Sequence, residues 1–199
     1  MRVHPAGPTA LLAAVADADA ARSLAEFVRT QCPDIVDVVP AAETVLFDGV
    51  ADHRALRAAL QDWRPGVTSP TSRSTVTIPV RYDGPDLNAV AEHWGVSVGE
   101  VVARHIGLDF VAAFGGFSPG FSYLSGLPPE WAVHRLPTPR TRVPPGSVAV
   151  GDTWCAVYPH ATPGGWLILG STSARMWDPT RADPALLPPG TPVRFVEGP

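Results

Sequence analysis

The sequence contains no lysine, and all 15 of its basic residues are arginine. A Schiff-base lysine, a lysine general base and a phosphate-binding loop of the GxxxxGK[ST] type are therefore excluded. Any anion that binds this chain must be held by arginine or by backbone N–H groups. A reaction that consumes ATP would need a nucleotide site of another kind, or one on another chain.

Cysteine and long apolar runs are also scarce. The two cysteines, Cys32 and Cys155, lie far apart, and no His/Asp/Glu spacing indicates a metal site. The net charge is −4 and no basic run occurs, which argues against nucleic acid or an anionic membrane as a partner. No signal-peptide pattern and no apolar run of about 18 residues is present, so we expect a cytoplasmic protein.

Proline is unevenly distributed, with 6 residues before position 79 and 17 from Pro79 onward. Residues 2–63 read as β-β-α-β-β-α, with room for one further strand, which predicts one sheet with two helices on one face. Asp17 or Asp19 is placed to cap the first helix, and Asp52 the second, over residues 51–63. We predict a domain boundary within residues 65–78.

The second part has many short apolar segments between Gly/Pro turns and two short helices, which predicts a closed β-barrel. Asp86 is expected to cap the first of these helices, and Ser97 with Glu100 forms a capping box for the second. Gly151 and Asp152 are expected to form a tight hairpin turn. We therefore predict an α+β fold with domains 1–73 and 74–199.

Three segments combine glycine, proline and aromatic residues: FGGFSPGFSYLSGLP (114–128), TPRTRVPPGS (138–147) and YPHATPGGW (158–166). Loops of this composition are stable only when they pack together. Loops on a β scaffold commonly carry binding sites. An equally good interpretation is that these are the tight turns of a proline-rich barrel.

The same segments supply candidate binding groups. Alternation places Arg140 and Arg142 on one face of an extended segment, where they could clamp a carboxylate. The alternative is solvated arginines or pairs with Asp/Glu. Four aromatic residues either wall a small pocket or pack as core at the barrel mouth, and Gly164 and Gly165 could let backbone N–H groups approach a ligand. These aromatics are Phe121, Tyr123, Tyr158 and Trp166.

His105 continues an apolar helix face formed by Val98, Val101 and Val102. It is either a buried, hydrogen-bonded core histidine or a proton carrier at a cleft. His134 and His160 are isolated and are expected at the surface.

The motifs GFSPGFSYLSGL, TPRTRVPPGSVAV and YPHATPGGWLILG, in this order and spacing, resemble the family of 5-oxoprolinase B subunits, also called allophanate hydrolase subunit 1. The family includes a bacterial sporulation-kinase inhibitor, and the resemblance extends over residues 2–196. It implies a ferredoxin-like domain over 1–73 and a cyclophilin-like β-barrel over 74–199.

The resemblance also implies an activity and partners. The chain would be one component, inactive alone, of a complex that uses ATP to open 5-oxo-L-proline to L-glutamate. Its expected partner is a carboxyltransferase-like protein of the type found as the 5-oxoprolinase C subunit or allophanate hydrolase subunit 2, with room for a third 5-oxoprolinase component. The hypothesis assigns catalysis to His105, Arg140 and Arg142 and expects no metal. The expected substrate-binding residues are Phe117, Pro119, Gly120, Phe121, Tyr123, Tyr158, Pro159, Gly164, Gly165 and Trp166.

The sequence departs from the family pattern at three places. Residues 152–157 read DTWCAV where the family has GGQTGI, so Trp154 and Cys155 replace a Gln and a Thr. Ser171 replaces an Arg, and Ser122 replaces a Pro. Two alternatives follow: a diverged paralogue acting on another lactam or urea-derived substrate such as allophanate, or a non-catalytic module that inhibits a sensor histidine kinase.

Overall fold

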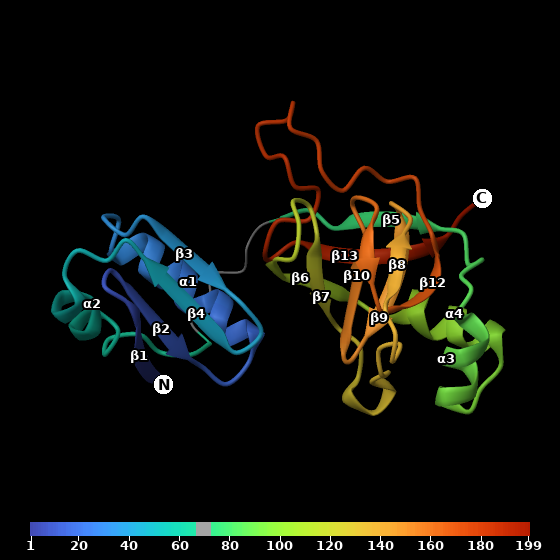
Figure 1. Cartoon of the computed structure of the whole chain (residues 1–199), viewed down its shortest axis with the longest axis horizontal. Helices are drawn as coiled ribbons and strands as arrows, with labels where there is room; N and C mark the ends of the chain where they lie inside the picture. Colours follow the sequence, from blue (N-terminus) through green and yellow to red (C-terminus); the bar gives the residue numbers. More distant parts are fainter. Residues whose placement is uncertain (67–72) are drawn as a thin grey trace. The chain divides into compact units, whose positions relative to one another are not determined.

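The computed structural model describes residues 1–66 and 73–199. The chain divides into two compact units, Met1–Ser72 and Arg73–Pro199 (Figure 1). Part of the predicted boundary region, and part of the stretch after the second helix where a further strand was expected, fall on residues 67–72, outside the described residues. No helix in the described ranges is long and apolar enough to span a membrane.

The first unit is a four-stranded antiparallel sheet in the order β1-β2-β4-β3. One cluster of buried residues joins the two helices to the sheet, with Leu24, Phe47 and Leu56 among its members. The elements are β1 (Arg2–Gly7), β2 (Ala10–Ala14), α1 (Ala18–Gln31), β3 (Asp37–Pro40), β4 (Thr44–Asp48) and α2 (His53–Ala59).

Both helices of this unit begin at predicted caps. The Asp17 carboxylate accepts a hydrogen bond from the Ala20 N–H at 2.8 Å, and the Asp52 carboxylate accepts from Arg54 and Ala55. Each cap satisfies backbone donors that have no partner within the helix. The second helix is shorter than predicted and ends at Ala59, although Trp63 beyond it is still buried in the core.

The second unit is a nearly closed barrel, where the sequence predicted a closed one, and the chain as a whole mixes α and β structure. Seven strands follow the order β12-β9-β10-β7-β6-β13-β5. The two edges meet where Arg81 and Ser171 exchange backbone hydrogen bonds, both of 2.9 Å. The strands are β5 (Val76–Val80), β6 (Phe110–Gly115), β7 (Ser122–Ser125), β9 (Ser147–Gly151), β10 (Trp154–Val157), β12 (Leu167–Ser171) and β13 (Pro192–Glu197).

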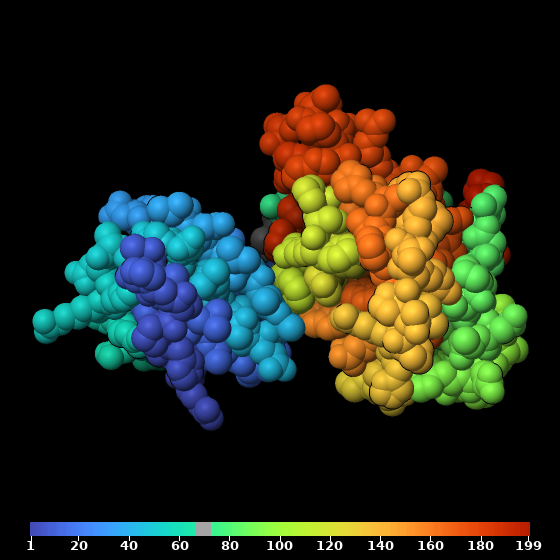
Figure 2. Space-filling view, in the orientation of Figure 1, coloured from blue at the N-terminus to red at the C-terminus, as the bar shows by residue number. Residues whose placement is uncertain are grey.

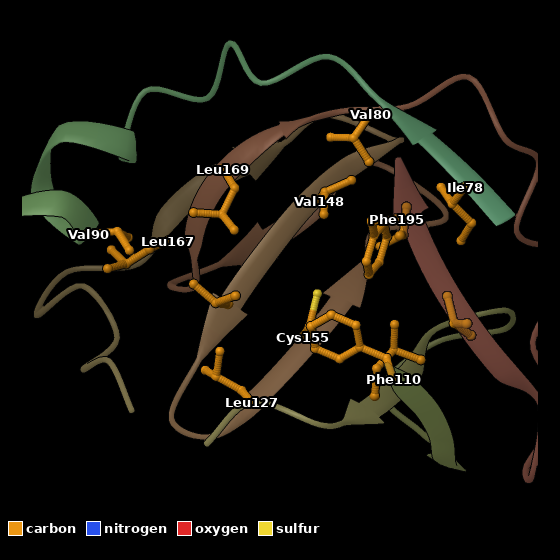
Figure 3. Packing of buried hydrophobic residues seen from close by; sticks show 14 of the residues in the cluster. Ile78, Val80, Val90, Phe110, Leu127, Val148, Cys155, Leu167, Leu169 and Phe195 are labelled. Carbon is orange, nitrogen blue, oxygen red and sulfur yellow. The ribbon is translucent and has the colours of Figure 1, made fainter. Parts of the chain in front are cut away.

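The barrel strands carry two apolar faces. Val148, Cys155 and Leu169 belong to the interior cluster together with Phe110 and Phe195 (Figure 3). Their neighbours along the strands face outward, because successive strand residues point to opposite sides. The outward residues Ala149, Ala156, Tyr158 and Ile168 form a separate buried cluster.

Two further strands and two helices belong to this unit. The strands β8 (Arg140–Val143) and β11 (Thr162–Gly164) form a separate two-stranded sheet, and Val143 joins the outward cluster. The helices are α3 (Leu87–Trp94) and α4 (Val98–Gly107). Ser97 caps α4 by accepting from the Glu100 N–H, which is one half of the predicted capping box, whereas the Glu100 carboxylate pairs with Arg104. Residues 172–191 connect β12 to β13 and stand out from the barrel (orange-red in Figure 2).

Gly170 gives a test of the barrel closure. A Cβ at this position would collide with the carbonyl oxygen of Arg81, the residue that joins the two sheet edges. We expect Gly170→Ala to lower the free energy of unfolding by about 2 kcal/mol, because a rigid backbone must move. Gly107→Ala is the matched control, since a Cβ there meets nothing within 4 Å, and it should be neutral or stabilising by up to about 1 kcal/mol. Urea denaturation of both variants distinguishes the two, and equal stabilities would refute a tight closure.

Candidate functional site

The three Gly/Pro/aromatic segments meet on the outer face of the barrel. Phe121 comes from the first segment, Val143 from the second, and Tyr158 and Trp166 from the third, and all four belong to one buried cluster. The Phe121 ring centroid lies 5.3 Å from that of Tyr158 and 5.7 Å from that of Trp166. The candidate site is therefore built from segments that are far apart in sequence.

These aromatic rings fill the space between them. Phe121, Tyr158 and Trp166 are 3%, 2% and 4% exposed, and their rings meet edge to face. Tyr123 is half-buried and lies 5.6 Å from the Trp166 ring. Of the two interpretations left open by the sequence, core packing describes Phe121, Tyr158 and Trp166 in this structure.

Trp154, one of the departures from the family pattern, extends this aromatic layer. Its ring lies 5.2 Å from Phe114 and 6.0 Å from Tyr123, both in edge-to-face geometry. Phe114 and Tyr123 are themselves stacked at 4.5 Å. The indole therefore supplies packing contacts where an amide would supply polar ones.

Phe117 differs from the other aromatics because it is 60% exposed. It also has a φ of 66°, a left-handed conformation that is uncommon for a residue with a side chain. Pro119 beside it is exposed and Gly120 is half-buried. Phe117 is thus the aromatic residue of this loop that a ligand or partner can reach.

The Tyr158 hydroxyl lies directly against Gly164, a residue of the same segment. A Cβ at Gly164 would collide with this hydroxyl, so glycine is required for the close approach. Burial raises the pKa of Tyr158, while a hydrogen bond from the Trp166 backbone and the charges of Arg135 and Arg140 oppose that shift. The hydroxyl is therefore a neutral hydrogen-bonding group at neutral pH. Pro159 and Gly165, which follow Tyr158 and Gly164 in the sequence, are half-buried.

Arg140 forms an ion pair that the sequence did not locate. Its Nη2 donates to both carboxylate oxygens of Asp86, at 2.7 and 2.9 Å, and its Nη1 lies 3.4 Å from the Trp166 carbonyl oxygen. The same carboxylate accepts from the Ile168 N–H at 2.7 Å. The prediction that Asp86 caps α3 is wrong, since its side chain makes no capping hydrogen bond. Its carboxylate instead accepts hydrogen bonds from Arg140 and from the Ile168 N–H of β12.

The predicted double clamp of Arg140 and Arg142 is not present as two free guanidinium groups. Arg140 is neutralised by Asp86, which is the alternative of pairing with a carboxylate, whereas Arg142 is exposed. The pairing of β8 with β11 is irregular. Arg140 pairs with Gly164 and Val143 with Thr162, so β8 has one more residue between these two pairs than β11 has. Such a bulge breaks the simple alternation on which the clamp was predicted.

His105 lies in the barrel interior and not at a cleft. It is 0% exposed, and its ring lies 4.6 Å from that of Phe195 and 5.3 Å from that of Phe110. Its Nδ1 is 2.7 Å from the Tyr82 hydroxyl and its Nε2 is 3.4 Å from the Cys155 sulfur. Burial lowers the pKa of His105 to about 3. The assignment of His105 as a proton carrier is therefore corrected to a neutral core histidine.

Cys155, the second departure, occupies the interior beside His105. Burial raises the pKa of the Cys155 thiol and, with nearby charges as smaller causes, that of the Tyr82 hydroxyl. The three groups form a neutral hydrogen-bonded chain, Tyr82–His105–Cys155, that satisfies both ring nitrogens. The side chain at position 155 therefore makes its contacts in the barrel core and not on the outer face.

The remaining departures lie away from the aromatic cluster. Ser122 is buried and donates to the Leu187 carbonyl oxygen at 2.6 Å. Ser171 lies at the barrel closure, beside a cavity of about 310 Å³ that is also lined by Arg81. His134 and His160 are exposed, as expected. Among residues 1–66 and 73–199, no group of three or more His, Cys, Asp or Glu side chains could hold a metal ion.

Comparison with known proteins gives concordant matches. The family described as carboxyltransferase domain, subdomain C and D, matches residues 1–187. A protein named as the B subunit of 5-oxoprolinase, from Escherichia coli O157:H7, is 43% identical over 173 residues, covering 82% of this chain and 78% of that protein. The crystal structure of TTHA0988 matches with a TM-score of 0.80 and 34% identity.

The match to TTHA0988 covers 96% of this chain but only 40% of that protein, so the chain spans less than half the length of that structural relative. The urea amidolyase of K. lactis matches with a TM-score of 0.74 over 98% of this chain and 15% of its own. At 18% identity, this second match concerns the fold alone.

Proposed function

Because this chain belongs to the family of 5-oxoprolinase B subunits, we propose that it is one component of an ATP-dependent amidohydrolase complex that opens 5-oxo-L-proline to L-glutamate. The observation that carries this proposal is the long match to a protein with that name. The partner would be a carboxyltransferase-like protein, and a third component completes the 5-oxoprolinase assembly. The chain alone would be inactive.

The residues of this chain do not fit an ATP site of their own. The sequence has no lysine and no phosphate-binding loop. We therefore assign the nucleotide to another chain of the complex.

Among the described residues, the contribution of this chain is a rigid aromatic face with exposed cations at its edge. Phe121, Tyr158 and Trp166 are packed too closely to admit a ligand, so they support the loops above them. Phe117, Pro119 and Arg142 are exposed and can be reached by the partner. Among the described residues, Arg142, unlike Arg140, has no carboxylate partner, so it can bind a carboxylate supplied from outside the chain. His105 takes no part, since it is buried and neutral.

The test is co-expression with the carboxyltransferase-like protein of the same genome, followed by ADP release from ATP with and without 5-oxoproline. We expect a stable complex whose ATP turnover depends on 5-oxoproline, and no turnover by either chain alone. A complex that hydrolyses ATP without regard to 5-oxoproline would refute the substrate. A chain that forms no complex would refute its role within an assembly.

A second substrate class is favoured by Trp154 and Ser171. Trp154 contributes packing and Ser171 a short hydroxyl where the family pattern has an amide and a guanidinium, so donors for a polar substrate are fewer. This change supports a diverged paralogue acting on another lactam or on a urea-derived substrate such as allophanate. Ammonia release from allophanate, measured beside ADP release in the presence of 5-oxoproline, distinguishes the two.

At the level of fold, we propose a cyclophilin-like barrel and a ferredoxin-like first unit. The barrel's short strands and two helices support the first assignment. The strand order β1-β2-β4-β3, with α1 between β2 and β3, supports the ferredoxin-like assignment of the first unit. The edge strand β1 comes first in the sequence. We propose a cytoplasmic location for the complex.

A further inference from the structure

Phe117 occupies the centre of a three-residue turn with a strained backbone. The Ser118 N–H donates to the Gly116 carbonyl oxygen at 2.7 Å, which closes a γ-turn around Phe117, whose φ is 66°. A γ-turn with positive φ at its centre is rare and strained, and the Cβ of a phenylalanine adds to that cost. Glycine would adopt the same turn without a Cβ clash.

The loop holds this strained residue in one place. The Phe121 N–H donates to the Ser118 carbonyl oxygen at 3.0 Å, and the Gly116 N–H donates to the Phe121 carbonyl oxygen at 3.2 Å. The Phe117 ring rests edge-on against Phe121 at 5.2 Å and Tyr158 at 6.4 Å. Even so, 60% of Phe117 remains exposed, so this chain gains little burial in return for the strain. Strain that is retained under these conditions is typical of functional sites.

Unpaired positive charge gathers around the same aromatic cluster. Of the nine arginines between residues 73 and 199, six have a carboxylate partner. Three arginines among the described residues of this unit do not: Arg135, Arg142 and Arg181. The Arg135 guanidinium lies 5.6 Å from the Trp166 ring centroid, and Arg142 is exposed beside Val143, a member of the cluster.

We propose that Phe117, Arg135 and Arg142 form the docking surface for the carboxyltransferase-like partner. A rigid, projecting ring suits an apolar pocket on a protein better than a small ligand, because it projects from the surface and encloses nothing. The unpaired arginines suit carboxylates at the rim of that pocket. This inference rests on the proposed function. In the relative TTHA0988 the match covers only 40% of that chain, so further structure accompanies this fold there.

The test is the affinity of single variants for the carboxyltransferase-like protein of the same genome, measured by titration calorimetry. We expect Phe117→Ala to weaken binding about 30-fold, as for a buried aromatic anchor. Val196→Ala, another exposed hydrophobic residue of this unit at 37%, should leave the affinity unchanged. Arg142→Ala should weaken binding, and more strongly at low salt, whereas Arg181→Ala should not.

Phe117→Gly separates docking from folding. It removes the ring together with the Cβ strain, so we expect Tm to stay within a few degrees of wild type while binding falls as in Phe117→Ala. A complex that forms normally with Phe117→Gly overturns this surface but leaves the proposed function intact. A wild-type chain that forms no complex overturns both. Equal losses for Arg142→Ala and Arg181→Ala would refute the part assigned to the rim.

Discussion

Asp86→Ala should lower the free energy of unfolding by about 3 kcal/mol, because it removes one partner of a largely buried ion pair. The Asp86 side chain is 9% exposed and accepts from both the Arg140 guanidinium and the Ile168 N–H. Its loss leaves the Arg140 charge, at 27% exposure, without a counter-charge, and leaves a buried backbone donor unsatisfied. Urea unfolding followed by near-UV circular dichroism measures the change.

Asp83→Ala is the matched control for this experiment. Asp83 pairs with Arg81 at 2.6 Å, but the two side chains are 44% and 64% exposed, so solvent screens the pair. Its removal should cost less than about 1 kcal/mol. Equal effects of the two substitutions would show that Asp86 does not hold α3, β8 and β12 together.

The Asp86–Arg140 pair also shows where sequence reasoning fails. An aspartate just before a helix is a strong capping signal, and the same rule correctly located Asp17 and Asp52. At Asp86 the carboxylate binds Arg140, 54 residues away, because charge-assisted hydrogen bonds from a guanidinium are stronger than a capping bond from a neutral N–H. A local sequence pattern cannot identify a partner that is distant in the sequence.

The barrel strands illustrate a second limit. Alternation identifies a strand face only when one face is polar, and in β9 and β10 both faces are buried. The strands themselves could be predicted, as could their hairpin turn at Asp152, which has a φ of 56°. Which side Trp154 and Cys155 take could not be predicted, because it depends on register with neighbouring strands. In the structure, Cys155 points inward and contacts His105, whereas Trp154 packs with the aromatic residues of the outer face.

The packing of the three Gly/Pro/aromatic segments against one another could be predicted from the sequence, but its detail could not. Gly/Pro-rich composition indicated that the segments pack together, and they do. It did not distinguish buried Phe121 from exposed Phe117, because both lie in the same glycine-rich loop. The γ-turn that makes this difference depends on a backbone conformation that is unusual for phenylalanine.

His105 should make the stability of the barrel depend on pH in a way that a surface histidine does not. Its pKa is lowered to about 3 in the folded chain from an ordinary value of 6.5, so the unfolded chain binds the extra proton between these values. The stabilising contribution is complete above pH 6.5 and is lost as the pH falls below it. Well below pH 6.5 the slope should be about 1.4 kcal/mol per pH unit, and the loss between pH 6.5 and 4.5 should be about 2 kcal/mol.

His105→Gln isolates this effect, because an amide can replace both hydrogen bonds to Tyr82 and Cys155 without titrating. We expect the variant to be less stable than wild type at pH 7 but to lose less stability on acidification. His160→Gln, which removes an exposed imidazole from the same unit, is the control. If wild type and His105→Gln lose stability in parallel below pH 6.5, His105 does not titrate as a buried residue. In that case the proton carrier predicted from the sequence would again be a candidate, since a histidine that protonates near neutrality must be able to reach water.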